Sequence, residues 1–325
     1  MPGSTLAASS TTVTGTTAPD AAVTAADSDT TTGAATSVTS TTADASGAFS
    51  ASVPVSSGSN VITVSATAAG GRSTGYGQVT IGYEGGGSSV LDVTDPAGDD
   101  NGPGTYQYPT ATNPDGSPVF VPGSFDLTRF QVLSDGTYAY LRVTLRTLVP
   151  TFGAINGAQL LDVYVHVPGA SPTSTAAAYA SRNYSIASSG AWSQRVEVQG
   201  FASPVWVNAS GGTLGTPFVL ANGGDKTITV ALPESSFGKP GSGWGFSVVL
   251  TGQDGFSPDQ ARAFTATPGA FTFGVCAPGG TAPICSVNPN TVPKAMDVIT
   301  PAGVSQATEL NPTLGPVAIQ PVIVP

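Results

Sequence analysis

Thr137-Tyr138-Ala139-Tyr140-Leu141-Arg142-Val143-Thr144-Leu145 alternates small or aliphatic residues with polar or aromatic ones. Side chains of a β-strand point alternately to the two faces of its sheet. The aliphatic members of this stretch would therefore face a core, and the tyrosines, Arg142 and Thr144 would face outward. The stretch predicts an antiparallel strand with one apolar face and one aromatic, polar face.

The same alternation returns further along the chain. Residues 161–167 read Leu-Asp-Val-Tyr-Val-His-Val, which would place Asp162, Tyr164 and His166 on an outward face. Further strands are expected at 195–200, 226–232, 244–251 and 317–324. No stretch shows a sustained helical period. We therefore expect an all-β chain whose residues 90–325 form a larger antiparallel β-sandwich of jelly-roll type.

The beginning of the chain predicts a second, smaller sandwich. Residues 48–53, 60–66 and 78–83 alternate with period two between glycine-rich turns. Short strands at this spacing indicate an immunoglobulin-like spacer domain over 1–84, although the Cys and Trp hallmarks of antibody domains are missing. Residues 85–89, Gly-Gly-Gly-Ser-Ser, have the composition of a flexible linker.

The charge balance excludes several classes of partner. Only 9% of the residues are charged, and 10 Lys and Arg face 20 Asp and Glu, so the formal net charge is −10. Such a chain has no basic surface with which to hold a phosphate backbone or an anionic membrane. It also has no apolar run of about 18 residues that would insert into a bilayer. Neither nucleic acid nor membrane insertion is expected.

The two cysteines indicate the compartment. Cys276 and Cys285 are separated by a Gly/Pro loop that lets the two sulfurs meet, and a local disulfide is favoured over two free thiols. A disulfide favours an oxidising, extracellular location for a secreted protein. Met1-Pro2-Gly3-Ser4 carries no signal peptide and is interpreted as the start of a piece of a longer protein.

The larger predicted domain carries a series of specific motifs. It opens with residues 95–109, Asp-Pro-Ala-Gly-Asp-Asp-Asn-Gly-Pro-Gly-Thr-Tyr-Gln-Tyr-Pro, followed by 123–130, Gly-Ser-Phe-Asp-Leu-Thr-Arg-Phe. Further motifs follow at Leu161–His166, Arg182–Tyr184, Ala191–Trp192, Val198–Phe201, Gly243–Phe246, Gly252–Gly255 and Met296–Pro301. In this order they resemble the C-terminal module of glucodextranase and of related amylopullulanases. The first domain is similar to the Ig-like module that precedes it in glucodextranase, through Val13–Thr17 and Gly47–Phe49.

The resemblance implies a fold and a function. The fold would be a β-sandwich related to DOMON and family 9 carbohydrate-binding modules. The function would be that of a non-catalytic accessory region, which docks a secreted glycoside hydrolase on a polysaccharide, an α-glucan such as dextran, pullulan or starch. Its partner would be a catalytic domain upstream in the same protein. One alternative is attachment to the cell envelope as a surface-layer-like module. Another is an architectural domain that packs on the catalytic domain and binds nothing.

An acidic turn is a candidate Ca²⁺ site. Asp95, Asp99 and Asp100 lie within six residues of one another beside several glycines, and Asp126 would add a ligand from the next strand. Hard oxygen ligands on a flexible turn suit Ca²⁺, and the resemblance to Ca²⁺-containing sandwich modules favours a structural ion here. The other interpretation is a solvated turn whose aspartates accept hydrogen bonds from backbone amides.

Sugar recognition needs flat apolar faces for CH groups and fixed polar groups for hydroxyls. The predicted carbohydrate-binding residues are Trp192, Trp206, Tyr138, Tyr140, Tyr164, Arg142, His166, Gln159 and Arg182. The alternative for each tryptophan is an ordinary core position, and this alternative is favoured for Trp244.

Independent catalysis by this chain is not expected. Glycoside hydrolysis needs two carboxyl groups across a cleft, and nothing in the spacing of Asp162, Glu197 and Asp254 requires them to converge. No Gly-x-Ser-x-Gly elbow accompanies His166, the only histidine. Haem, which some DOMON relatives bind, is not expected either, because His166 and Met296 are too few axial ligands.

Overall fold

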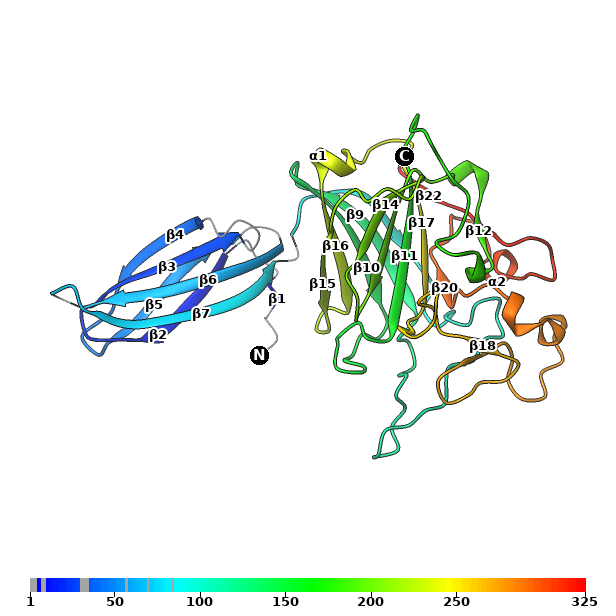
Figure 1. Ribbon diagram of the computed structural model, residues 1–325, viewed down its shortest axis with the longest axis horizontal. Coiled ribbons are helices and arrows are strands. Elements are labelled where there is room, and N and C mark those ends of the chain that lie inside the picture. Colours follow the sequence, from blue (N-terminus) through cyan, green and yellow to red (C-terminus); the bar gives the residue numbers. More distant parts are fainter. Residues whose placement is uncertain (1–4, 7–9, 30–34, 56–57, 69, 84) are drawn as a thin grey trace. The chain divides into compact units, whose positions relative to one another are not determined.

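The computed structural model describes residues 5–6, 10–29, 35–55, 58–68, 70–83 and 85–325. The chain divides into two compact units, Met1–Gly87 and Ser88–Pro325, and strands dominate both of them (Figure 1). Among the described residues the only α-helices are two single turns, α1 (Glu234–Phe237) and α2 (Gln306–Glu309), and no helix is long and apolar enough to cross a bilayer. The predicted all-β fold class is confirmed.

The first unit is a small β-sandwich. Its larger sheet has the order β1-β7-β6-β3-β4, formed by β1 (Thr5–Leu6), β7 (Ser73–Tyr83), β6 (Gly58–Thr67), β3 (Ala22–Asp29) and β4 (Ala35–Thr42). The second layer pairs β2 (Ser10–Thr16) with β5 (Ala48–Pro54). Small residues such as Ala25 and Ala51 fill the core together with Val53 and Ile62.

The second unit is built around two antiparallel sheets. The first sheet runs in the order β15 (Phe218–Asn222), β16 (Thr227–Pro233), β10 (Tyr138–Leu145), β9 (Leu127–Ser134) and β8 (Ser88–Thr94). The second runs in the order β14 (Val205–Asn208), β13 (Gln194–Gln199), β11 (Gln159–His166), β17 (Gly245–Gly252) and β20 (Asp297–Val298), with β22 (Val322–Ile323) also on β17. Leu141, Val143, Val163 and Phe246 belong to the continuous core of this unit.

Strand β10 has most of the burial pattern that its sequence predicts. In β10, Leu141 and Val143 are buried in the core and Arg142 and Thr144 are partly exposed. Tyr140 differs, because it is fully buried and its hydroxyl donates to Asp135 Oδ2 (2.6 Å). Because this hydrogen bond satisfies the hydroxyl, the tyrosine side chain can be fully buried.

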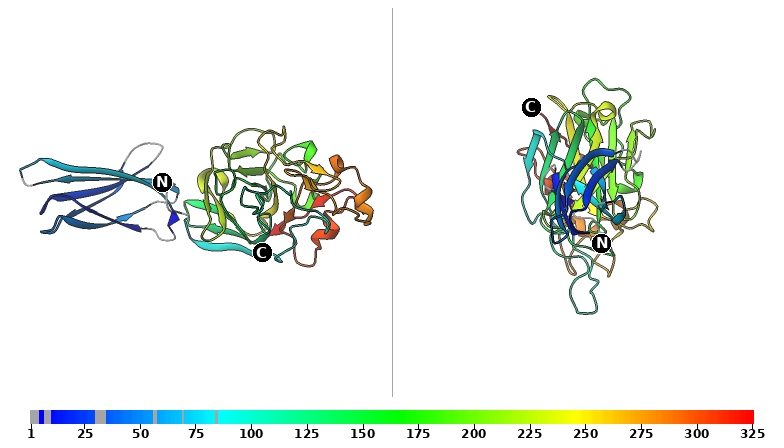
Figure 2. Two further views of the ribbon diagram at one scale, coloured as in Figure 1. Left: turned by 90° about the horizontal axis from the view of Figure 1, so that it is seen from below. Right: turned by 90° about the vertical axis from the view of Figure 1, so that its left-hand side faces the viewer.

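The second sheet is covered on both faces. A separate hydrophobic cluster, which includes Tyr164, Trp192, Leu310 and Ile319, joins its outer face to segments that leave the sandwich. One of these segments contains β12 (Ser185–Ile186), which pairs with β21 (Ala318–Ile319). A further short pair, β18 (Phe264–Thr265) with β19 (Phe273–Gly274), contributes Phe264 and Phe273 to the main core. The chain after β17, coloured orange to red, gathers on one side of this unit in Figure 1 and in the left view of Figure 2. The expectation of an exposed outer face on 161–167 is therefore wrong: only His166 remains partly exposed in β11.

One of the long connections is closed covalently. Cys276 and Cys285 form a disulfide with an S–S distance of 1.99 Å. Cys276 and Ile284 are buried in the main core, so the bridge anchors this loop on the sandwich.

Candidate metal centre and aromatic cavity

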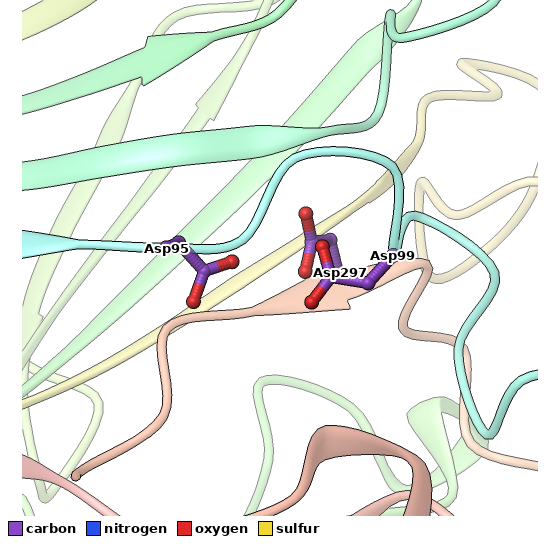
Figure 3. Close-up of side chains that lie close together, drawn as sticks. All are labelled: Asp95, Asp99 and Asp297. Atoms are coloured by element: carbon purple, nitrogen blue, oxygen red, sulfur yellow. The ribbon is translucent and has the colours of Figure 1, made fainter.

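Three aspartates from distant parts of the chain converge beside the second sheet. Asp95 follows β8, Asp99 lies in the next turn, and Asp297 begins β20. One carboxylate oxygen from each lies within 4.8 Å of the others. Figure 3 shows Asp95 facing Asp99 and Asp297, which lie side by side. We call Asp95, Asp99 and Asp297 the carboxylate cluster.

Hydrogen bonds hold the backbone around the carboxylate cluster. Leu127 N–H donates to Asp297 Oδ2 (2.6 Å) and Val298 N–H donates to Asp297 Oδ1 (2.8 Å). Gln306 in α2 links the two segments, since its Nε2 donates to the Asp99 carbonyl (2.6 Å) and its Oε1 accepts from Val298 N–H (3.0 Å). These bonds fix the carboxylate of Asp297 and tie the backbone of Asp99 to that of Val298.

The electrostatics of the carboxylate cluster disfavour negative charge. Burial, reinforced by Asp99 and Asp126, raises the pKa of Asp95 to about 8. Burial also raises the pKa of Asp99 to about 6, and that of Asp297 well above its ordinary value. At neutral pH these groups lack the compensation that a buried carboxylate needs.

Oxygen atoms of this region also lack hydrogen-bond donors. Asp95 Oδ2, Asp99 Oδ1 and Asp126 Oδ1 are buried and have no partner among the described residues. Native proteins satisfy most buried polar atoms, so several orphaned oxygens in one place need an explanation. Hard, anionic oxygen donors are the set that Ca²⁺ accepts, and the residues present fit such an ion.

The structure distributes the four predicted metal ligands unevenly. Asp95 and Asp99 lie in the cluster, and Asp126 is close enough for its charge to raise the pKa of Asp95. Asp100 lies outside it, because its carboxylate accepts a hydrogen bond from the Tyr108 hydroxyl. The sequence reasoning missed Asp297. Its motif, Met296–Pro301, was noticed, but nothing in the sequence placed that motif beside the acidic turn.

A second feature is a cavity of about 840 Å³ at one end of the second sheet. Phe152, Phe201, Phe256 and Phe271 line it and remain exposed by 48%, 53%, 101% and 51%. A soluble protein rarely gathers large exposed apolar side chains without a use for them. We call these four residues the phenylalanine rim.

Polar side chains complete the wall of the cavity. Gln199, Gln253, Asp254 and Gln260 line it together with the phenylalanine rim. Gln253 is fixed in place, since its Oε1 accepts from Gly200 N–H (2.7 Å) and its Nε2 donates to Gln199 Oε1 (3.2 Å). The cavity therefore combines apolar ring faces with amide and carboxylate groups of defined position.

Arg262 also lines the cavity and contacts the segments that carry its aromatic rings. Its Nη1 and Nη2 donate to the carbonyls of Phe271 and Gln253, both at 2.7 Å. Its guanidinium lies over the ring of Phe120, 4.7 Å from the centroid, and 5.9 Å from that of Phe152. Cation–π contacts of this kind hold aromatic rings in fixed orientations.

The predicted carbohydrate-binding residues do not form this cavity. Six of them are buried: Trp192, Trp206, Tyr140, Tyr164, Gln159 and Arg182. The other three, Tyr138, Arg142 and His166, are partly exposed but lie on strands of two different sheets. The structure thus offers no common surface for the set. For Tyr164 and Trp192 the reason is the covering layer over β11, which turns the expected outward face into an interior. Trp206 packs in the main core instead, and Tyr140 packs on the first sheet.

Trp192 and Trp206 are both held inside the protein by hydrogen bonds of their indole N–H groups. Trp192 Nε1 donates to the Ala176 carbonyl (2.8 Å), and Trp206 Nε1 donates to Gln194 Oε1 (2.9 Å). A buried indole whose N–H is already satisfied packs as a core residue. Of the two interpretations the sequence left open, the structure supports the core position for both.

Asp162 and Glu197 do converge, but inside the protein. They are cross-strand neighbours on β11 and β13. Arg182 contacts Asp162 at 2.5 Å and Glu197 at 3.3 Å, and Arg195 contacts Glu197 at 3.2 Å. Both carboxylates are 1% exposed. A buried, paired couple of this kind has no access to a substrate, unlike the pair of a glycosidase.

The chain was compared with protein families, curated proteins and solved structures. A family model described as the C-terminal binding-module, SLH-like, of glucodextranase matches residues 90–320. No curated protein matches the chain. Among solved structures, a biofilm associated protein (BSP domain) is similar at 12% identity with a TM-score of 0.18. That match covers 76% of this chain and 25% of the other.

Proposed function

The chain belongs to the family of SLH-like C-terminal binding modules of glucodextranase, and from this membership we propose that it docks a secreted glycoside hydrolase on its polysaccharide. The larger unit would hold the polymer, an α-glucan such as dextran, pullulan or starch. A catalytic domain elsewhere in the same protein would cut it. Tethering the two raises the local substrate concentration without any bond cleavage by this chain.

The aromatic cavity is the observation that carries this proposal. A pyranose ring presents CH groups on its faces and hydroxyls at its edge. The phenylalanine rim offers exposed ring faces for the former, and Gln199, Asp254 and Gln260 offer polar groups for the latter. A volume of about 840 Å³ accommodates a short stretch of sugar units.

A secreted location fits the chemistry of the second unit. The Cys276–Cys285 disulfide persists in an oxidising compartment. We infer that the polymer is extracellular too, because a secreted module would meet its polysaccharide outside the cell. The partners we propose are therefore an extracellular polysaccharide and the catalytic domain of the same protein.

Removing two rings of the rim tests the proposal. We expect Phe201→Ala combined with Phe256→Ala to weaken binding to dextran, pullulan or starch at least about tenfold, because each lost stacking contact contributes about 1 kcal/mol. Affinity electrophoresis of the full chain in gels containing each polymer measures this. Both rings are at least half exposed, so their loss leaves the core intact.

Tyr179→Ala is the matched control. Tyr179 is a less exposed ring (38%) that contacts the Arg182 guanidinium and does not line the cavity, and its removal should leave retardation unchanged. Equal retardation of the double variant and the wild type, or no retardation of the wild type by any of the three polymers, would contradict glucan docking through the cavity.

Attachment to the cell envelope is the second candidate function. The description of the family module as SLH-like favours it. Sedimentation of the chain with washed bacterial cell walls, in the presence and absence of soluble dextran, separates the two. Sedimentation that dextran does not reduce, together with no retardation in glucan gels, would reverse our order of preference.

A further inference from the structure

The region around the carboxylate cluster carries far more negative than positive charge. Asp126, which is 0% exposed, adds a fourth carboxylate, and its charge raises the pKa of Asp95, Asp99 and Asp297. Within the described chain, the ion pair that reaches this group joins Arg146 Nη1 to Asp126 Oδ2 at 3.5 Å. The Arg146 side chain is 57% exposed, so water screens most of its effect.

The orphaned oxygens are a second and independent observation. Asp126 accepts from Gly98 N–H (2.8 Å) through Oδ2, but its Oδ1 is buried with no donor. Asp95 Oδ2 and Asp99 Oδ1 are in the same position. Buried acceptors without donors are costly, and here they belong to three neighbouring carboxylates. A single cation that takes several oxygen ligands would compensate all three of these atoms at once.

We propose that Asp95, Asp99 and Asp297 bind one Ca²⁺ ion, with the carboxylate of Asp126 beside it. The cluster supplies oxygen ligands alone, which argues for a hard cation over zinc. Two of its members lie on a turn and the third on a strand, an irregular arrangement that Ca²⁺ tolerates better than Mg²⁺, which demands near-ideal octahedral geometry.

The ion would join the two sheets of the larger unit. Asp95 and Asp99 follow β8 of the first sheet, and Asp297 starts β20 of the second. The hydrogen bonds of Gln306 already link the same two segments, from Asp99 to Val298. A shared cation would add a second connection at this edge, and it would balance the charge that the hydrogen bonds leave uncompensated.

Calorimetry and thermal unfolding of the full chain test the site. All three tryptophans, Trp192, Trp206 and Trp244, lie in the larger unit, so intrinsic tryptophan fluorescence follows that unit alone. We expect CaCl₂ to bind with a stoichiometry near one per chain. We also expect it to raise the melting temperature by about 5 °C over the value in EDTA.

Asp95→Asn is the decisive variant. No hydrogen bond of the Asp95 side chain is lost in this nearly isosteric change, which removes one charge. The variant should lose the Ca²⁺ response, and in EDTA it should melt no lower than the wild type because it relieves repulsion. Asp99→Asn provides the same test at a second position. Asp100→Asn is the matched control: its carboxylate is engaged by Tyr108, and the Ca²⁺ response should persist.

The opposite results overturn the proposal. If the wild type shows no heat of binding and the same melting temperature in CaCl₂ and EDTA at pH 7, the carboxylates are protonated and no ion binds. If Asp95→Asn and Asp99→Asn respond to CaCl₂ as the wild type does, any Ca²⁺ that binds lies elsewhere.

Discussion

Arg182 is a completely buried cation in contact with two carboxylates. Asp162 and Glu197 lie on neighbouring strands, and the guanidinium reaches both of them while Nη2 also donates to the Asp259 carbonyl (2.7 Å). Ionic groups in an interior are tolerated only when each finds a partner. Arg182, which the sequence suggested as a carbohydrate-binding residue, is thus needed by the fold itself.

Arg182→Met should therefore destabilise the larger unit by about 3–5 kcal/mol, because two buried carboxylates lose their main counter-charge. Urea unfolding followed by tryptophan fluorescence measures the change. Arg129→Met is the matched control, since Arg129 pairs with Asp92 at the surface, where the side chains are 45% and 36% exposed. There the loss should stay below about 1 kcal/mol. Similar losses of unfolding free energy in the two variants would show that the buried ion pairs stabilise the protein no more than the surface pair does.

Glu309 should give the larger unit a pH-dependent stability. Burial raises the pKa of Glu309 to about 7, while Gln320 N–H donates to its Oε1 (2.7 Å). Because the folded state binds this proton more tightly, the contribution is fully present below about pH 4.5 and is lost as the pH rises through about 7. Glu309→Gln keeps the acceptor and removes the titration. The fall in unfolding free energy of the wild type between pH 5 and pH 8 should shrink by about 1–2 kcal/mol in the variant, allowing for partial exposure.

Urea unfolding of both proteins at pH 5 and pH 8 provides the comparison. A wild type and a variant whose stabilities change in parallel between the two pH values would show that Glu309 titrates normally in the folded protein.

Period-two patterns predicted where most strands lie, but they did not predict which faces of those strands are buried. The expected strands at 195–200, 226–232 and 244–251 lie in β13, β16 and β17, whereas 317–324 is divided between β21 and β22. Alternation reports which residues differ along a strand. It does not report that a connection far away in sequence will cover the polar face, as happens over β11.

The candidate sites were predictable only where they are local. Asp95 and Asp99 are four residues apart, so the sequence alone predicts that they lie close together. Asp297 is far from them in the sequence and reaches them through the pairing of β20 with β17. The phenylalanine rim has no periodic signal, since Phe152, Phe201, Phe256 and Phe271 lie in connections between strands. Only the folded chain brings such loops to one place.

The segment 95–126 connects the carboxylate cluster with the phenylalanine rim. It begins at the carboxylate cluster with Asp95 and Asp99, and ends at Asp126. Between them, Phe120 is buried and packs edge-on against Phe152 and Phe271 of the rim, with centroids 5.7 and 6.2 Å apart. Phe120 lies six residues before Asp126 in the sequence, so an ion bound beside Asp126 would restrain the segment that carries this ring.

Removal of Ca²⁺ should therefore weaken glucan binding as well as stability. We expect EDTA to reduce retardation of the wild type in a dextran, pullulan or starch gel severalfold, and Asp95→Asn to show the reduced value with or without CaCl₂. Affinity electrophoresis at a temperature well below the unfolding transition measures this. Retardation that EDTA leaves unchanged would mean that the cavity keeps its shape independently of the ion.

The path of the segment 95–126 would also make polymer binding depend on the calcium concentration of the surroundings. If Ca²⁺ steadies the cavity as proposed, the protein would hold its polymer less tightly wherever free calcium is scarce. A chelator would then release it from a starch or dextran column without any competing sugar.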